Sequence, residues 1–296
     1  MDGLQTLRVE RAAGGLARVT MARAQVHNAF DEVMIGELDR VFAALADDAA
    51  VRVIVLAGDG RHFSAGADLQ WMQRASSAPL DWNLADARSF AAMLARIATC
   101  PKPTLARVHG AALGGGVGLA CACDIAIAAD DARFAVSESK FGILPSVIGP
   151  YLVNAVGPRQ ARRLALTASR IDAAEALAIG LVHQVAPAEG LDAAVDTSVR
   201  DLLACGPQAL REIKQLFDQL EVGPVTDSVR ELTAQTIARV RGSDEAREGF
   251  AAFLSRRAAN WSTPAGSGAR PAAASTTGAA CAPANPAPKS RCSTCR

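Results

Sequence analysis

The sequence is poor in aromatic residues and almost neutral in net charge. Its 296 residues include 9 Phe, 3 Trp and 1 Tyr, and 31 basic side chains stand against 30 acidic ones. A net charge of +1 provides no surplus positive charge for nucleic acid or an anionic membrane surface. No apolar run has the length of a membrane span, and residues 1–4 lack the features of a signal peptide. We therefore expect a cytoplasmic protein with no nucleic-acid or membrane partner.

Several motifs of well-known chemistry are missing as well. The chain has no G-x-G-x-x-G and no G-K-[ST], so it lacks the motifs of Rossmann and P-loop nucleotide sites. It also has no G-x-S-x-G and no H-E-x-x-H, the motifs of two hydrolase classes. Its 7 cysteines are not a disulfide framework in a chain of this kind. Cys292 and Cys295 have CxxC spacing, but no second pair or nearby His completes a zinc site. We predict no metal.

Glycine, by contrast, is concentrated in one stretch. Five glycines fall between Gly110 and Gly118, after the apolar run 104–108 and before a run of small residues that favours a helix. Glycines let the backbone bend sharply and let a ligand approach the peptide groups. At a helix start, free N–H groups and the helix dipole favour an anion or a developing oxyanion. The alternative is a tight turn that packs a helix against a sheet.

A second loop of the same character lies upstream. Residues 62–69, which contain Ser64, Gly66 and Asp68, follow the strand-like run 51–56 and lead into a helix-like segment. Two such junctions between a strand and a helix can direct two N–H groups at one carbonyl oxygen. The pair of loops therefore predicts an oxyanion hole.

The remaining pattern predicts an α/β protein. Strands are expected at 4–10, 16–21, 51–56, 104–108, 125–129 and 181–185, and helices at 31–45, 69–72, 89–98, 158–166, 172–179, 191–204, 208–220, 225–240 and 244–259. A variable linker is expected at 76–81. Residues 262–296 are rich in Ala, Pro, Ser, Thr and Gly and contain no acidic residue, so we expect a disordered tail.

The two glycine loops carry a family resemblance. Residues 64–69 and 112–116, in this order and spacing, resemble the two signatures of the enoyl-CoA hydratase/isomerase (crotonase) superfamily, and the match extends over 7–261. The resemblance implies a spiral of ββα repeats holding the acyl-CoA site over 1–190, and a C-terminal helical trimerisation region over 191–261. It also implies an acyl-CoA substrate, no cofactor apart from that CoA, and a homotrimer or dimer of trimers.

The resemblance also assigns site residues. The N–H groups of Ala67 and Gly115 would bind the thioester oxygen. The segment 134–145 aligns with the family's segment around its downstream glutamate, which makes Glu138 the acid/base, although a surface glutamate is the alternative. Residues expected near the CoA are Asn28, Ala65, Asp68, Leu69 and Gly114. Asn28 could equally be a helix cap.

One position departs from the family's two-glutamate pattern. Hydratases of this pattern have Glu where this chain has Gly118, and family isomerases keep only the downstream glutamate. The runs 62–72 and 114–119 nevertheless resemble bacterial methylglutaconyl-CoA and γ-carboxygeranoyl-CoA hydratases of leucine and acyclic terpene breakdown, some of which carry Gly there. The leading hypothesis is an enoyl-CoA hydratase, a carbon–oxygen lyase. The alternatives are an enoyl-CoA Δ3-Δ2 isomerase and a non-catalytic acyl-CoA-binding protein.

A glutaconyl substrate would bring a second carboxylate into the acyl pocket. Burying that charge without a partner is costly, so a cation is expected at the far end. Lys140 and Arg74 lie close enough in sequence to the site residues to be candidates, although each could be a solvated surface charge. Arg256 and Arg257 are expected near the CoA by resemblance.

Overall fold

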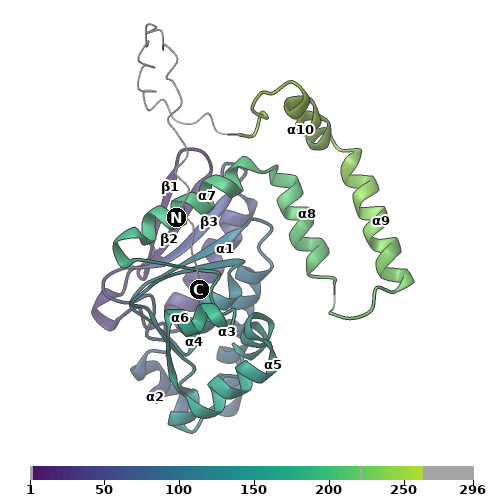
Figure 1. Cartoon of the computed structure of the whole chain (residues 1–296). Helices are drawn as coiled ribbons and strands as arrows, with labels where there is room; N and C mark the ends of the chain where they lie inside the picture. The colour runs from purple at the N-terminus through teal and green to yellow at the C-terminus, as the bar shows by residue number, and fades with distance from the viewer. Residues whose placement is uncertain (1–2, 221, 263–296) are drawn as a thin grey trace, which may run out of the picture. The chain divides into compact units, whose positions relative to one another are not determined.

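Two β-sheets lie at the centre of the chain (Figure 1). The structure is a computed structural model that describes residues 3–220 and 222–262. The larger sheet contains β1 (Leu7–Ala12), β2 (Leu16–Met21), β3 (Val53–Gly58), β4 (Thr104–Val108), β6 (Ile125–Ala129) and β9 (Gln184–Ala186), in that order. β1 and β2 form an antiparallel hairpin, and the other neighbours are parallel. The smaller sheet has the order β5 (Ala111–Leu113), β7 (Arg133–Ala135), β8 (Arg170–Asp172).

Helices connect and cover these strands. They are α1 (Glu32–Asp47), α2 (Leu69–Ser77), α3 (Leu80–Ala98), α4 (Gly115–Ala122), α5 (Gly149–Thr167), α6 (Ala173–Ala178), α7 (Leu191–Ala204), α8 (Pro207–Phe217), α9 (Asp227–Arg241) and α10 (Asp244–Leu254). Short 3-10 helices lie at η1 (Ala24–Val26), η2 (Glu138–Phe141) and η3 (Ala188–Gly190). Strands alternating with helices confirm the predicted α/β class.

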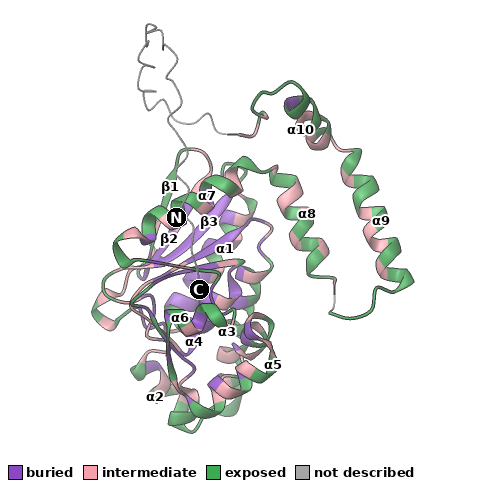
Figure 2. Ribbon diagram, viewed as in Figure 1, coloured by how far each residue is buried: buried purple, intermediate pink, exposed green. Residues whose placement is uncertain are grey.

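Strand β3 shows why the larger sheet needs cover on both faces. Its side chains alternate: Ile54 and Leu56 belong to one core cluster, and Val53 and Val55 to the other. The first cluster includes Leu38, Phe42 and Leu45 of α1. The second is completed by Leu191, Val195 and Val199, which recur at helical spacing on α7. Figure 2 shows the buried strands between these helices.

The predicted elements differ from the observed ones at two helices and in the smaller sheet, since none of its strands β5, β7 and β8 was predicted. α3 begins at Leu80, not at residue 89, and only Ala78 and Pro79 separate it from α2, so the expected linker at 76–81 is wrong. Many residues in the first turns of α3 are exposed, and they lack the apolar periodicity that marks a helix in sequence. α5 begins at Gly149, and Gly157 with Pro158 kinks it where a helix start was expected.

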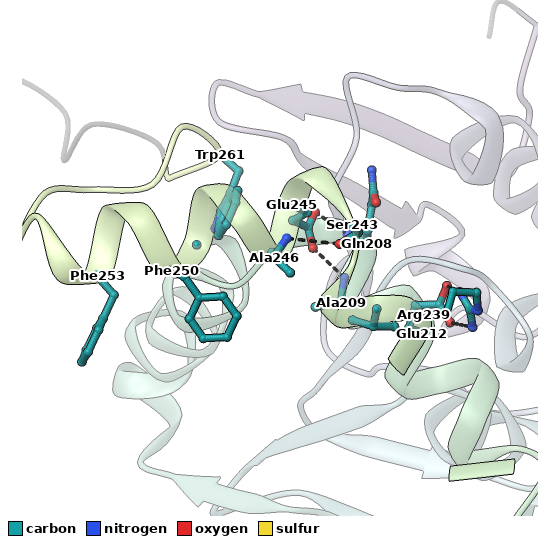
Figure 3. Close-up of a pocket in the computed structure, with 13 residues that line it drawn as sticks. Gln208, Ala209, Glu212, Arg239, Ser243, Glu245, Ala246, Phe250, Phe253 and Trp261 are labelled. Atoms are coloured by element: carbon teal, nitrogen blue, oxygen red, sulfur yellow. Dashed lines mark hydrogen bonds and ion pairs between the residues drawn. The ribbon is translucent and has the colours of Figure 1, made fainter. Parts of the chain in front are cut away.

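The C-terminal helices pack less tightly. The predicted C-terminal helical region, 191–261, begins with α7. The structure packs α7 on the larger sheet, so α7 belongs to the body and α8 to α10 form the C-terminal helices. Among the described residues of α8, α9 and α10, Ala252 alone is buried. These helices line a cavity of about 560 Å³. Figure 3 shows Phe250, Phe253 and Trp261 at its wall. The predicted tail at 262–296 lies outside the described residues apart from Ser262.

Across the part of the chain that the structure describes, no helix combines the length and apolarity needed to cross a bilayer.

Candidate active site

The two glycine loops lie side by side although they are almost 50 residues apart in sequence. Ser64 and Ala112 form an isolated parallel bridge, in which Ser64 N–H donates to Ala111 O and Leu113 N–H donates to Ser64 O, each at 3.0 Å. Gly66 adopts φ +88°, and a Cβ there would lie 2.6 Å from Leu113 O. A side chain at position 66 would therefore push the loops apart.

Each loop leaves one N–H group unused. Around Ala67, Phe30 N–H donates to Gly66 O and Asp68 N–H donates to Phe30 O, so the intervening Ala67 N–H points away from this bridge. Gly115 is the first residue of α4, where the N–H has no acceptor in its own helix. Among the hydrogen bonds of the described residues, none uses the N–H of Ala67 or of Gly115.

Ala67 and Gly115 line two cavities. One, of about 730 Å³, is lined by basic and histidine side chains that include Arg23, His27, Lys140 and Arg170. The other, of about 510 Å³, is mainly apolar, with Phe30, Trp71, Phe90 and Ile148 in its wall. Both cavities are also lined by a common set of residues: Ala67, Met72, Gly115, Glu138, Phe141 and Ile143. A long ligand with an anionic end and an apolar end fits this pair.

Glu138 stands at the shared part of the two cavities. It is the first residue of η2, and its Oε1 would lie 3.1 Å from a Cβ placed on Gly114. Its Oε2 is buried and has no hydrogen-bond partner among the described residues. Burial raises the pKa of the Glu138 carboxyl, and hydrogen bonds from the backbone of Glu138 and Ser137 oppose that effect in part. This carboxyl is therefore suited to hold and release a proton.

The space around Gly118 is closed to a second carboxylate. A Cβ on Gly118 would lie 2.3 Å from Cγ2 and 2.8 Å from Cβ of Ile148, which is buried. Ile148 thus occupies the space that a glutamate at position 118 would need.

The predicted CoA residues divide into two groups. Ala65, Leu69 and Gly114 line the larger cavity, and 73% of Leu69 is exposed, which leaves it free for a ligand. Asn28 is fully buried, and its amide binds Arg23 N–H, Asp59 O and His62 O. Its side chain therefore does not face the cavity. It is not a helix cap either, because Asp31 caps α1.

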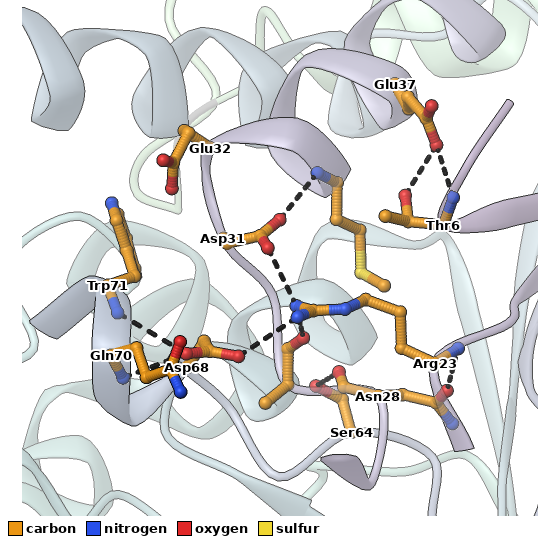
Figure 4. Close-up of polar contacts among 12 residues, drawn as sticks. Thr6, Arg23, Asn28, Asp31, Glu32, Glu37, Ser64, Asp68, Gln70 and Trp71 are labelled. Atoms are coloured by element: carbon orange, nitrogen blue, oxygen red, sulfur yellow. Dashed lines mark hydrogen bonds and ion pairs between the residues drawn. The ribbon is translucent and has the colours of Figure 1, made fainter. Parts of the chain in front are cut away.

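Asp68 lines the larger cavity, but its carboxylate is already paired (Figure 4). One oxygen accepts from Gln70 N–H at 2.9 Å and from Trp71 N–H at 3.3 Å, which caps α2. The other binds the Arg23 guanidinium at 3.1 Å, and the same guanidinium binds Asp31 at 3.0 Å. Asp68 therefore holds the loop 62–69 against the start of α1.

The candidate cations lie in different places. Lys140 lines the larger cavity. Arg74 lines neither cavity: it binds both oxygens of Glu32, at 2.7 and 2.8 Å, on the surface. Arg257 pairs with Glu248 at 2.6 Å, and neither Arg256 nor Arg257 lines the two cavities.

Asp86 lines the apolar cavity but is not among the site residues predicted from the sequence. Asn83, Asp86, Ala87 and Phe90 recur at helical spacing on α3 and line this cavity together. Asp86 accepts a hydrogen bond from the indole Nε1 of Trp71 at 3.1 Å. The sequence pattern predicts this helix only from residue 89 onward, because Asn83 and Asp86 are polar and add nothing to an apolar helical pattern.

Two free N–H groups beside a half-buried carboxyl can together stabilise an oxyanion and move a proton, which is the chemistry expected of an enzyme site. The chain belongs to the enoyl-CoA hydratase/isomerase family, whose pattern matches residues 11–264.

A crystal structure of an enoyl-CoA hydratase from Shewanella pealeana is similar, with a TM-score of 0.84, 40% identity, and coverage of 87% of this chain and 96% of that one. An enoyl-CoA hydratase/isomerase from Marinobacter aquaeolei has a TM-score of 0.82 and 34% identity, covering 87% and 99%. The crotonyl-CoA hydratase of Syntrophomonas wolfei is 35% identical over 254 residues, 83% of this chain and 94% of that protein.

Proposed function

We propose that this chain is an enoyl-CoA hydratase that adds water to a 2-enoyl-CoA thioester. The observation that carries the proposal is the common lining of the two cavities. It combines the unused N–H groups of Ala67 and Gly115 with the half-buried Glu138 carboxyl. The names of the similar proteins support the same reaction.

One carboxyl suffices for both proton transfers. Ionised Glu138 takes a proton from water while the water oxygen bonds to C3, and the C2=C3 electrons shift toward the thioester oxygen. The N–H groups of Ala67 and Gly115 bind the resulting enolate oxygen. Glu138 then returns the proton to C2, so that one water is added and the carboxylate is regenerated. A raised pKa favours this exchange, because Glu138 must hold the proton between the two steps.

The larger cavity is proposed to hold the CoA part of the substrate. Its side chains Arg23, His27, Lys140 and Arg170 provide hydrogen-bond donors and positive charge for phosphate groups, although Arg23 is partly neutralised by Asp31 and Asp68. CoA is then part of the substrate, and the proposal needs no further cofactor.

The acyl group would enter the apolar cavity. The subgroup resemblance favours branched glutaconyl esters, but of the two candidate cations Arg74 lies outside both cavities and Lys140 lines only the larger one. We therefore propose a 2-enoyl-CoA as the substrate, and the glutaconyl subtype stays a prediction.

Assembly as a homotrimer or dimer of trimers in the cytoplasm also stays a proposal. The exposed apolar side chains of α10 support association between copies of the chain, since 81% of Phe253 and 79% of Leu254 are exposed.

The Δ3-Δ2 isomerase remains a second candidate because Ile148 excludes a carboxylate at position 118. One assay separates the functions: the purified chain is incubated with a 2-enoyl-CoA or a 3-enoyl-CoA, and the absorbance of the 2-enoyl thioester is followed. Loss of absorbance from the first substrate supports hydration. Gain from the second supports isomerisation. No change with either, at several chain lengths, would refute the proposed enzyme and leave an acyl-CoA-binding protein.

A further inference from the structure

Asp86 places a carboxyl group in the wall of an otherwise mainly apolar cavity. Its neighbours in that wall include the rings of Phe30, Trp71 and Phe90, and Phe30 packs against both others with centroids 6.0 and 5.1 Å apart. Among the described residues, Glu138 is the other ionisable side chain that lines this cavity.

The position of the Asp86 carboxyl is well defined. Trp71, which is only 7% exposed, donates its indole N–H to Asp86 Oδ1 at 3.1 Å. No other hydrogen bond or ion pair between described residues uses the Asp86 carboxylate. Oδ2 is therefore left for solvent or a ligand.

The charge on Asp86 is weakly compensated. Partial burial raises the pKa of Asp86, and the nearby Glu32 raises it further, whereas the Trp71 hydrogen bond and Arg74 lower it. The Arg74 guanidinium is bound to both oxygens of Glu32. A second carboxylate entering this cavity would meet a like charge at low dielectric, with no cation in the described lining to offset it.

We propose that Asp86 determines acyl-chain specificity: it excludes acyl groups that end in a carboxylate and leaves the cavity to uncharged chains. The inference rests on the proposed function, because the acyl group must enter the apolar cavity. It opposes the glutaconyl subtype that the subgroup resemblance favours.

Binding of saturated acyl-CoA esters tests this without requiring turnover. Hexanoyl-CoA and glutaryl-CoA are of similar length and differ in the terminal carboxylate. Their Kd values are measured by calorimetry with the full chain, with Asp86→Asn and with Asp81→Asn. Asparagine keeps an oxygen for the Trp71 N–H. Asp81 lies exposed on the same helix and outside both cavities, which makes it the matched control.

Wild type and Asp81→Asn should bind glutaryl-CoA at least tenfold more weakly than hexanoyl-CoA. Asp86→Asn should reduce that ratio by about tenfold, chiefly through tighter glutaryl-CoA binding. Equal affinity of wild type for the two esters would overturn the inference even if Asp86→Asn did not fold, as would an unchanged ratio in a folded Asp86→Asn. The hydration assay reports separately on the proposed function, so the two failures are distinguishable.

Discussion

The body of the chain (β1 to α7) buries most of its large apolar side chains, whereas the last three helices (α8 to α10) leave theirs at least partly exposed. From β1 to α7, strands and helices bury Leu, Val, Ile and Phe in two core clusters that cover both faces of the larger sheet. Along α8 to α10, apolar side chains such as Phe217, Phe250 and Phe253 are more than half exposed. The body can therefore build a rigid site by itself. The C-terminal helices have apolar surface left for another partner.

This contrast implies that chemistry and assembly can be separated by substitution. Substitutions in the body should change activity or stability, and substitutions in the C-terminal helices should change the mass of the assembly.

The largest effect is expected at Glu138. Glu138→Gln keeps the size of the side chain but cannot exchange the proton, so kcat should fall by about 10²–10⁴-fold. The molecular mass measured by light scattering and the Kd for a saturated acyl-CoA should change little. Glu189→Gln, at an exposed glutamate of η3 in the body, is the control. Near-normal activity of Glu138→Gln would show that another acid performs the reaction.

A smaller effect is expected when a carboxylate is added to the body. Gly118→Glu should lower the free energy of unfolding by about 1–3 kcal/mol, because the new side chain meets Ile148. Gly36→Glu is the control, since a Cβ on this glycine of α1 has no neighbour within 4 Å. Denaturant titrations measure both variants.

The cause can be isolated with a double-mutant cycle. Gly118→Glu should cost at least about 0.5 kcal/mol less when Ile148 is already alanine than when it is present. Additive effects would mean that Ile148 is not what closes this space.

In the C-terminal helices the expected effect is on assembly. Phe253→Ser removes an exposed apolar side chain of α10, so at micromolar concentration the molecular mass should shift toward the monomer. Leu80→Ser, which is equally exposed at the start of α3, should leave the mass unchanged. An unchanged mass in Phe253→Ser would show that this face does not join copies of the chain.

The smallest effect is expected from removal of residues 263–296. Their composition, without acidic residues and rich in Ala, Pro and Ser, cannot form a packed core. A chain ending at Ser262 keeps the hydrogen bond between Arg52 and Trp261 O, so its Tm, mass and activity should match the full chain. Loss of assembly on truncation would contradict this prediction.

Much of the fold follows from local sequence patterns. The hairpin β1–β2 and strands β3, β4 and β6 were predictable because alternating or continuous apolar runs end at turn residues. The two glycine loops were recognisable because their residue order carries the resemblance, and the family match is confirmed. The start of α3 was missed because its exposed first turns carry no core pattern.

Local residue order was enough to predict the α/β class and the two glycine loops, and the family resemblance of segment 134–145 pointed to Glu138 as the candidate acid. Which groups lie together depends on tertiary packing. The bridge between Ser64 and Ala112 brings the N–H groups of Ala67 and Gly115 to the same cavities. Long-range packing likewise closes the space at Gly118 with Ile148 and brings Asp86 to the indole of Trp71. No local pattern encodes such contacts, because each joins segments that are distant in the chain and depends on how whole elements pack.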